Sequence, residues 1–331
     1  MFLRVIRASE WWDYKIPPLL AIAYATLLIY EKNIYSFTGV ILLMLLSLVV
    51  GAIYVSIIND ITDVTEDLAA GKKNRMAKTS TVFKIFIPLI LLAIGLGFIL
   101  FFYRVDPLSV FFYSMPWILF SLYSFEPFRF KKRGFLGILC DAGGSHIFTS
   151  LLIISFLTYK AGGMLNFVWL FSVAAWSTTY GLKGILWHQF TDRENDLKTG
   201  VNTFASRVNP RTFEKFEGII LAVELSALAC MLWAVHSVWP LVGFIFYVVL
   251  AFLRYKVLQR QPVIVSMKGK QNIQILTLDY FHAIFPVSLL FQACFTQQYG
   301  WIVLLAHLIL FQKSVLLILK DIWMIASRIF S

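Results

Sequence analysis

The chain has 331 residues, 59% of them hydrophobic, and its mean hydropathy is +0.77. A soluble protein of this length cannot bury so much apolar surface in one core, so the composition excludes an ordinary soluble fold and indicates an integral membrane protein. The net charge is +11, which we interpret as basic loops facing anionic membrane lipid, with no nucleic-acid partner. Only helices and closed barrels span a bilayer, and the long uninterrupted apolar runs favour helices.

These runs predict an all-α, polytopic membrane helix bundle of nine to ten transmembrane helices, with residues 1–331 forming one integral-membrane domain. The first span is short and follows Trp11, Trp12 and Tyr14, which could anchor it at the interface. It lacks a small-residue cleavage site, so we expect it to be retained rather than removed as a signal peptide. In chain order the candidate spans are 16–30, 36–58, 81–103, 107–123, 135–158, 165–190, 216–235, 237–255, 274–295 and 299–319.

Lysine and arginine residues orient this layout. They collect in alternate loops, whereas the loops on the other side contain only Lys32, Arg104 and Lys160. Because basic residues accumulate in cytoplasmic loops, both termini are predicted to be cytoplasmic, in a bacterial inner membrane. The three cysteines lie inside apolar runs without paired spacing, so neither a disulfide nor a zinc site is expected.

An acidic stretch, NDITDVTEDLAAGKKNRMAK, follows the second span. If the helix of that span continues, Asn59, Asp63 and Asp67 form an i, i+4, i+8 ladder along one face. Asp60 lies at the edge of this face. Several carboxylates so close together would repel one another without a cation, and hard oxygen ligands suit Mg²⁺, which also bridges carboxylates to phosphates. The alternative is a solvated loop that happens to be acidic.

A second acidic pair stands at the end of the sixth span, in WHQFTDRENDLKTGVNTF. Asp192 and Asp196 are four residues apart, and His188, one turn earlier, lies near the same face. Two acidic helix ends on the cytoplasmic side, each followed by basic residues, predict one site. There the carboxylates would bind a metal, the metal would bind a diphosphate, and cations would bind its remaining oxygens. The cations are Lys72, Lys73, Arg75, Lys78 and Lys198.

Weaker candidates come from two other segments. The cytoplasmic stretch YSFEPFRFKKRGFLG contributes Arg129 and Lys131 as possible phosphate ligands, although the positive-inside rule alone explains basic residues there. The fifth span contains polar side chains beside a Gly-Gly pair that is itself typical of helix packing. Polar groups inside a span are candidates for substrate contact. The predicted acceptor pocket comprises Tyr123, Asp141, His146 and His188.

With both motifs in place, the chain resembles the UbiA superfamily of intramembrane prenyltransferases. That family carries N-D-x-x-D-x-x-x-D after its second helix and D-x-x-x-D after its sixth, and here these stand at 59–67 and 192–196. The resemblance implies a helix bundle around a central cavity. In it Mg²⁺ would bind a polyprenyl diphosphate, and the prenyl group would pass to a small aromatic or lipid-precursor acceptor. The implied metal-side ligands are Asn59, Asp63, Asp67, Asp192 and Asp196, with Arg75 and Lys198 at the diphosphate.

The chain departs from the family pattern at Met76, where proline often follows the arginine. The segment YSFEPFRFKKR is closer to the longer form of the chlorophyll-synthase and archaeal ether-lipid branches than to the quinone branch, so the acceptor stays open. Two other functions also stay open. One is a terpene cyclase that ionises the same diphosphate without an acceptor. The other is a cation-coupled transporter, which should place acids near the membrane midplane and show an internal repeat.

Overall fold

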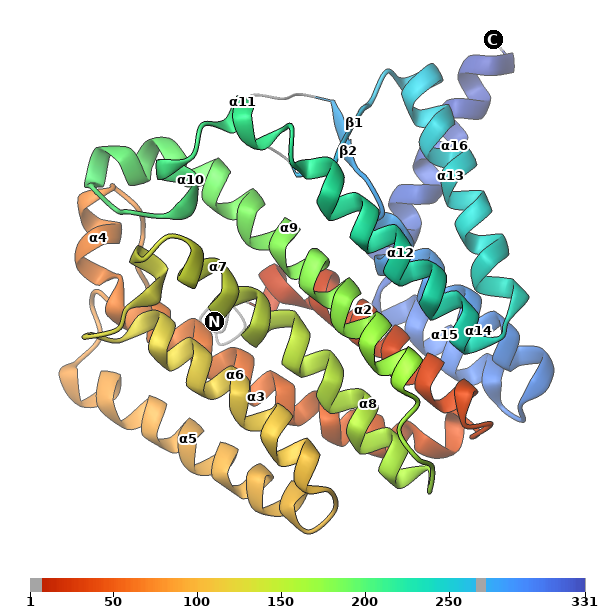
Figure 1. Ribbon diagram of the computed structural model, residues 1–331, viewed down its shortest axis with the longest axis horizontal. Helices are drawn as coiled ribbons and strands as arrows, with labels where there is room; N and C mark the ends of the chain where they lie inside the picture. Colours follow the sequence, from red (N-terminus) through yellow and green to blue (C-terminus); the bar gives the residue numbers. More distant parts are fainter. Residues whose placement is uncertain (1–7, 266–271, 331) are drawn as a thin grey trace.

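The computed structural model describes residues 8–265 and 272–330 and consists almost entirely of helices (Figure 1). Both chain termini lie outside these ranges. The strands in them, β1 (Gln261–Val263) and β2 (Ile273–Ile275), form one short parallel pair. The helices are α2 (Ala8–Ile29), η1 (Tyr35–Phe37), α3 (Thr38–Thr62), α4 (Val64–Ala69), α5 (Thr81–Tyr103), α6 (Pro107–Ser124), η2 (Phe130–Lys132), α7 (Phe135–Ala142), η3 (Gly143–Ile147), α8 (Phe148–Lys160), α9 (Phe167–Thr199), α10 (Phe204–Arg207), α11 (Pro210–Phe213), α12 (Glu217–Val235), α13 (Val238–Leu258), η4 (Tyr280–Ile284), α14 (Phe285–Thr296), α15 (Gly300–Leu310) and α16 (Gln312–Phe330).

Helix α2 lies in the centre of the bundle, although its sequence contains two consecutive prolines. Residues 16–27 are all buried, in contact with α8, α12 and α14. Pro18 has no N–H, so the Tyr14 carbonyl loses its usual donor four residues along the helix. The Tyr180 hydroxyl of α9 donates to this carbonyl at 3.0 Å. A side chain from a neighbouring helix therefore replaces the missing backbone hydrogen bond.

Helices α3 and α6 lie side by side and run in the same direction, with α5 returning between them in the sequence. The parallel register follows from three hydrogen bonds, Tyr113–Ser47, Tyr54–Ser121 and Ser124–Asn59. The C-terminal ends of α3 and α6 therefore both lie at the acidic motif that begins at Asn59.

Among the described residues, five helical segments are long and apolar enough to cross a membrane: Tyr35–Thr62, Thr81–Tyr103, Phe135–Lys160, Pro210–Val235 and Val238–Leu258. They differ in position within the bundle. The Phe135–Lys160 segment is 67% buried, whereas α5 is 17% and α13 is 22% buried. The first is thus an inner segment, and the other two present wide apolar faces suited to lipid.

The predicted span 299–319 is not one continuous helix. Helices α15 and α16 are separate and bend by 81°, because Phe311 between them leaves the helical region at φ −124° and ψ 34°. The new direction of α16 is fixed by Asp321, which is buried and bonds Arg260 twice at 2.7 Å. Arg254 of α13 also lies 2.7 Å from Asp321. An ion-pair network that hydropathy cannot detect therefore holds α16 against α13.

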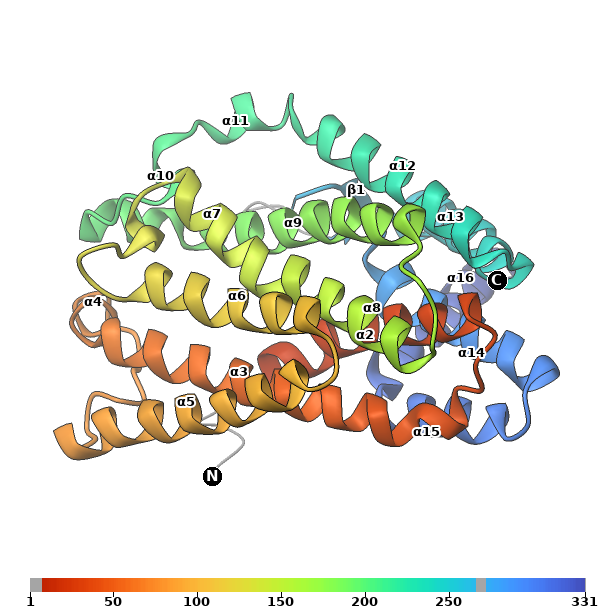
Figure 2. The ribbon, with the colours of Figure 1, turned by 60° about the horizontal axis from the view of Figure 1, so that its bottom comes forward.

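The two acidic motifs lie at the same end of the bundle. Both ribbon views show α4, the start of α7 and the α9–α10 connection gathered there (Figures 1 and 2). A backbone bridge between Gly134 and Thr203 ties the loop before α7 to the loop after α9. Gly134 has a φ of +59°, which favours glycine at this bridge.

Candidate functional site

The first acidic motif is not a continuous helix. Helix α3 ends at Thr62 and α4 begins at Val64, because Asp63 adopts φ −102° and ψ 3°. The predicted unbroken helical ladder is therefore wrong at this point. The hydrogen bonds nevertheless keep helical spacing, since Asp63 N donates to Asn59 O at 3.0 Å and Asp67 N to Asp63 O at 2.8 Å. The three predicted ligands remain one turn apart on either side of the break.

The basic loop after α6 packs directly against this motif. Arg129 Nη2 lies 2.8 Å from Glu66 Oε1 and 3.5 Å from Asp63 Oδ1. Lys131 Nζ forms an ion pair with Asp63 Oδ1, and Lys132 Nζ lies 2.5 Å from Glu66 Oε1. The predicted Arg129 and Lys131 thus do meet the first motif, and Glu66 and Lys132 join them.

Asn74 organises the loop that follows α4. Its Nδ2 donates to Asp67 Oδ2 and to Asp60 O, both at 2.8 Å, and its Oδ1 accepts from Met76 N at 2.8 Å. Met76, which stands where the family often has proline, is 1% exposed and packs in the hydrophobic core. The departure from the family pattern is therefore a buried side chain that anchors this loop.

Two other members of the first motif also contact polar side chains. Asn59 Oδ1 accepts from Ser124 Oγ at 2.5 Å. Asp60 is 2% exposed, and Arg75 Nη1 lies 3.5 Å from its Oδ2. The predicted diphosphate ligand Arg75 is thus an ion-pair partner of Asp60.

The two motifs are joined by an ion pair. Lys72 Nζ, after the first motif, lies 3.0 Å from Asp192 Oδ2 in the second. Thr203 Oγ1 donates to Asp196 Oδ2 at 2.9 Å. Burial raises the pKa of the Asp196 carboxyl, and the charges of Asp192 and Glu66 raise it further, against the Thr203 hydrogen bond and the charge of Lys72. Carboxylates from both motifs therefore share one electrostatic environment.

Three further predicted residues, Lys73, Lys198 and His188, lie at this end of the bundle. Lys73 and Lys198 are exposed, and within the described ranges neither contacts an acidic side chain of the motifs. His188 is exposed with its ring against Trp187, the ring centroids 4.7 Å apart, and it interacts electrostatically with Asp141. Their predicted roles stay predictions.

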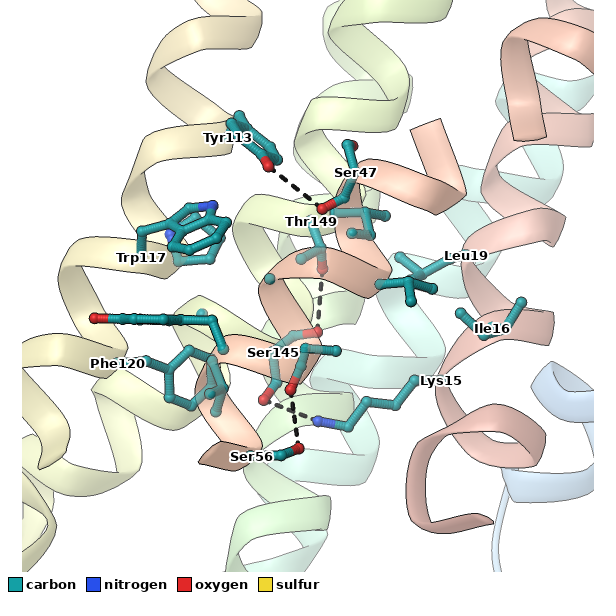
Figure 3. A pocket seen from close by; sticks show the side chains of 18 residues that line it. Lys15, Ile16, Leu19, Ser47, Ser56, Tyr113, Trp117, Phe120, Ser145 and Thr149 are labelled. Atoms are coloured by element: carbon teal, nitrogen blue, oxygen red, sulfur yellow. Dashed lines mark hydrogen bonds between the residues drawn. The ribbon is translucent and has the colours of Figure 1, made fainter. Parts of the chain in front are cut away.

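A cavity of about 130 Å³ opens between α2, α3, α6 and η3 (Figure 3). Its aromatic wall is formed by Tyr54, Tyr113, Trp117 and Phe120. Along α3 the lining runs from Ser47 to Ser56, and Ser56 lies about one turn before Asn59. One end of the cavity therefore adjoins the first motif, and the aromatic side chains extend away from it.

Three of the predicted acceptor residues lie inside the bundle near this end. Tyr123 interacts electrostatically with both Asp141 and Asp196, so it lies between the second motif and α7. His146 packs its ring against Tyr180 with centroids 4.9 Å apart, and Tyr180 also bonds His282. The structure thus brings Tyr123 and Asp141 toward the motifs. His146 lies beside Tyr180, whose hydroxyl donates to the Tyr14 carbonyl of α2.

Sequence reasoning missed two contributors and did not commit to two others. Glu66 lies on the same helix face as the predicted ladder and Lys132 lies in the predicted basic segment, so both were indicated without being chosen as site residues. Asn74 had no signal beyond being polar in a loop. Lys15 lines the cavity, but directly before an apolar span it has the pattern of an interface anchor.

The side chains of the two motifs fit a metal ion that is bound together with a phosphate group better than they fit a metal ion bound by the protein alone. All the motif side chains offer oxygen ligands, which suits Mg²⁺. Across the described ranges, however, no group of three acidic, histidine or cysteine side chains could hold a metal ion as arranged. Lysine and arginine stand between the carboxylates instead, at Asp63, Glu66 and Asp192.

Comparison with known proteins gives one consistent result. The sequence profile of the UbiA prenyltransferase family matches residues 19–265. No curated protein sequence matches. A UbiA homologue from Archaeoglobus fulgidus bound to GPP and Mg²⁺ is 15% identical, with a TM-score of 0.58 over 92% of this chain and 99% of that one. A structure of the Archaeoglobus fulgidus homologue without a stated ligand is 16% identical in sequence, with a TM-score of 0.56. Its structure bound to DMAPP and Mg²⁺ is 13% identical, with a TM-score of 0.53. Each comparison covers 92% of this chain and 98% of the homologue.

Proposed function

Because this chain belongs to the UbiA prenyltransferase family and is an integral membrane protein, we propose that it transfers a polyprenyl group to a small acceptor, with Mg²⁺ as its cofactor. The donor would be a polyprenyl diphosphate and the acceptor an aromatic compound or lipid precursor. The observation that carries the proposal is the junction of the two acidic motifs through Lys72 and Asp192, with basic side chains between the carboxylates. The structures of the Archaeoglobus homologue with prenyl diphosphates and Mg²⁺ support it.

At the diphosphate, the acidic residues of the motifs would bind Mg²⁺ and the basic residues would bind phosphate oxygens. Mg²⁺ would neutralise charge on the leaving diphosphate. Its ligands would come from Asn59, Asp60, Asp63, Asp67, Asp192 and Asp196. Lys72 and Lys131, now paired with carboxylates, would exchange those partners for phosphate oxygens, as would Arg129. Lys73, Arg75 and Lys198 are further cations at this end of the bundle.

The cavity would hold the prenyl chain and protect the reacting carbon. Its lining is mostly apolar, so it excludes water that would convert an allylic cation to an alcohol. Ring faces such as those of Tyr54 and Trp117, whose centroids are 4.8 Å apart, stabilise positive charge beside them. Tyr123, Asp141, His146 and His188 would contact the acceptor. We place this site on the cytoplasmic side of a bacterial inner membrane, with both termini on that side.

The test follows diphosphate release by detergent-solubilised protein supplied with geranylgeranyl diphosphate, Mg²⁺ and a panel of acceptors. We expect Asp63→Ala and Asp192→Ala to lower release at least 100-fold and EDTA to abolish it, because each change removes charge neutralisation at the leaving group. Glu31→Gln is the matched control, since it neutralises an exposed carboxylate after α2, away from both motifs.

Release that persists in EDTA, or in both aspartate variants, would refute the proposal. A cyclic hydrocarbon formed with diphosphate and Mg²⁺ alone would assign a terpene cyclase instead. Mg²⁺-coupled ion flux in proteoliposomes, without release from any donor, would assign a transporter.

A further inference from the structure

Helix α16 follows the segment that matches the family profile, since that match ends at residue 265. The beginning of α16 lies against the start of α2. Trp12 Nε1 donates to Leu310 O at 3.3 Å, and the rings of Trp12 and Phe311 stack with centroids 5.5 Å apart. Lys313 Nζ, in the first turn of α16, lies 3.3 Å from Asp13 Oδ2. One end of α16 is therefore fixed beside the N-terminal end of α2.

The other end of α16 lies against the C-terminal end of α13. Arg328 Nη1 donates to Val257 O at 2.9 Å. Between the two ends, the buried Asp321 lies 2.7 Å from Arg254 of α13. Figure 1 shows α13 and α16 side by side at the edge of the bundle.

Both of these contacts lie at the end of the bundle that carries the acidic motifs. Helix α3 ends at the first motif, so α2, the helix before it, starts at that end. Helix α9 ends at the second motif, α12 leads away from it, and α13 returns toward it. The two ends of α16 are thus at one membrane surface. The 81° bend after α15 turns α16 along that surface instead of across the bilayer.

Helix α16 has an exposed apolar face. Leu316, Leu319 and Trp323 lie within about 60° of one another around the helix axis. They are 55%, 54% and 70% exposed. Apolar side chains gathered on a surface indicate a contact with lipid or with another protein. Tryptophan is enriched where a membrane meets water, which is the level at which α16 lies.

A polar face adjoins the apolar one. Lys313, Lys320 and Ser327 lie within about 40° of one another and are all exposed. Lys313 is paired with Asp13, whereas in the described part of the chain Lys320 makes no hydrogen bond or ion pair. A helix with leucine and tryptophan on one face and lysine on the next is typical of helices that lie in the membrane interface.

We infer that α16 lies in the membrane interface and binds an anionic phospholipid. Leu319 and Trp323 lie among the acyl chains, and Lys320 contacts the charged headgroup. A second copy of the chain fits this face less well, because a two-fold contact brings the unpaired Lys320 toward its equivalent, and like charges repel. The inference does not depend on the proposed reaction.

Nitroxide labels test the placement of α16 on the full chain in lipid nanodiscs, in a variant whose three native cysteines are replaced. Power-saturation EPR compares collisions with oxygen, which concentrates in acyl chains, and with a water-soluble nickel chelate. We expect a label at Leu319→Cys to favour oxygen and one at Lys320→Cys, about 100° further round the helix, to favour nickel. Labels at Ile245→Cys in α13 and Met164→Cys in a loop calibrate the two extremes.

Three outcomes would overturn this placement. A helix that crosses the bilayer would give oxygen contact at both positions, and a helix in water would give nickel contact at both. A second copy covering the face would shield both labels from both reagents.

Energy transfer tests the lipid. A fluorophore at Ser327→Cys, on the face of Lys320, reports acceptor-labelled phosphatidylglycerol or phosphatidylcholine diluted into phosphatidylcholine nanodiscs. We expect about fivefold tighter binding of phosphatidylglycerol, the effect of one basic residue near an anionic headgroup. Lys320→Gln should remove this preference and Lys320→Arg should keep it. Lys215→Gln is the matched control, because it removes an exposed lysine before α12 and leaves α16 unchanged.

Unfolding temperatures are recorded for every variant, so that a misfolded protein is recognised. The preference should weaken at high salt, because salt screens exposed charges. The inference fails if the chain with native Lys320 shows no preference for phosphatidylglycerol. It fails equally if the preference survives in folded Lys320→Gln or does not respond to salt.

Discussion

The Tyr180 hydroxyl contributes to compensating the proline break in the central helix. Tyr180 donates to the Tyr14 carbonyl, which Pro18 leaves without a helical donor, and its ring contacts His146 and His282. A buried carbonyl without a partner costs free energy comparable to a lost hydrogen bond. The polar contacts of Tyr180 are therefore explained by the fold before any catalytic role is needed.

Tyr180→Phe should lower the free energy of unfolding by about 0.5–1.5 kcal/mol, because it removes the hydrogen bond from the Tyr180 hydroxyl to the Tyr14 carbonyl. Tyr159→Phe removes the same group from an exposed position and should change stability little. Thermal unfolding of both variants in detergent, followed by circular dichroism, measures the difference. Equal unfolding temperatures would show that the Tyr14 carbonyl finds another donor.

At the scale of elements, α5 approaches the bundle most closely at one tryptophan of α6. Trp117 of α6 lies against α3 at Gly51 and against α5 at Gly95, where an added Cβ would meet its ring at 2.8 Å. The same ring lines the cavity. Gly95 thus lets α5 pack directly against a side chain of the cavity wall, whereas Gly97, two residues on, faces open space.

Gly95→Ala and Gly97→Ala should have opposite effects. Both gain about 0.5–1 kcal/mol from lower backbone entropy in the unfolded chain. At Gly95 the rigid indole must shift, and overpacking costs about 1–3 kcal/mol, so the net change is destabilising. Unfolding temperatures in detergent decide this. An alanine at 95 that raises the temperature as much as one at 97 would contradict the packing described here.

At the scale of the whole molecule, the acidic motifs and the basic loop occupy one end, and the loops at the other carry few charges. Lys73 belongs to the first end, and Met164, 91% exposed, to the loop between α8 and α9. If the positive-inside rule holds, the two positions lie on opposite sides of the membrane.

Single cysteines test this arrangement in a variant whose three native cysteines are replaced. In intact bacterial cells a membrane-impermeant maleimide should label Met164→Cys and should reach Lys73→Cys only after the membrane is disrupted. Labelling of Lys73→Cys in intact cells would reverse the orientation and move the proposed site to the other face.

The sequence predicted the helices and the acidic motifs because both follow from local patterns. Apolar runs mark helices whatever their neighbours, and the spacing of Asn59, Asp63 and Asp67 survives the break because the hydrogen bonds keep a period of four. The contacts that complete the site join segments distant in the chain, such as Lys72 with Asp192 and Arg129 with Glu66. Tertiary packing alone decides these, as it decides the bend at Phe311, which lies within a continuous apolar run.

The ion pairs of the motifs also bear on when an ion would be needed. Asp63, Glu66 and Asp192 are already balanced by cations of the same chain, so mutual repulsion among the carboxylates does not have to be relieved from outside for the loops to fold. On the proposed function, the motif carboxylates would hold a divalent ion that supplies charge neutralisation at the diphosphate, while the ion pairs would keep the loops folded in its absence.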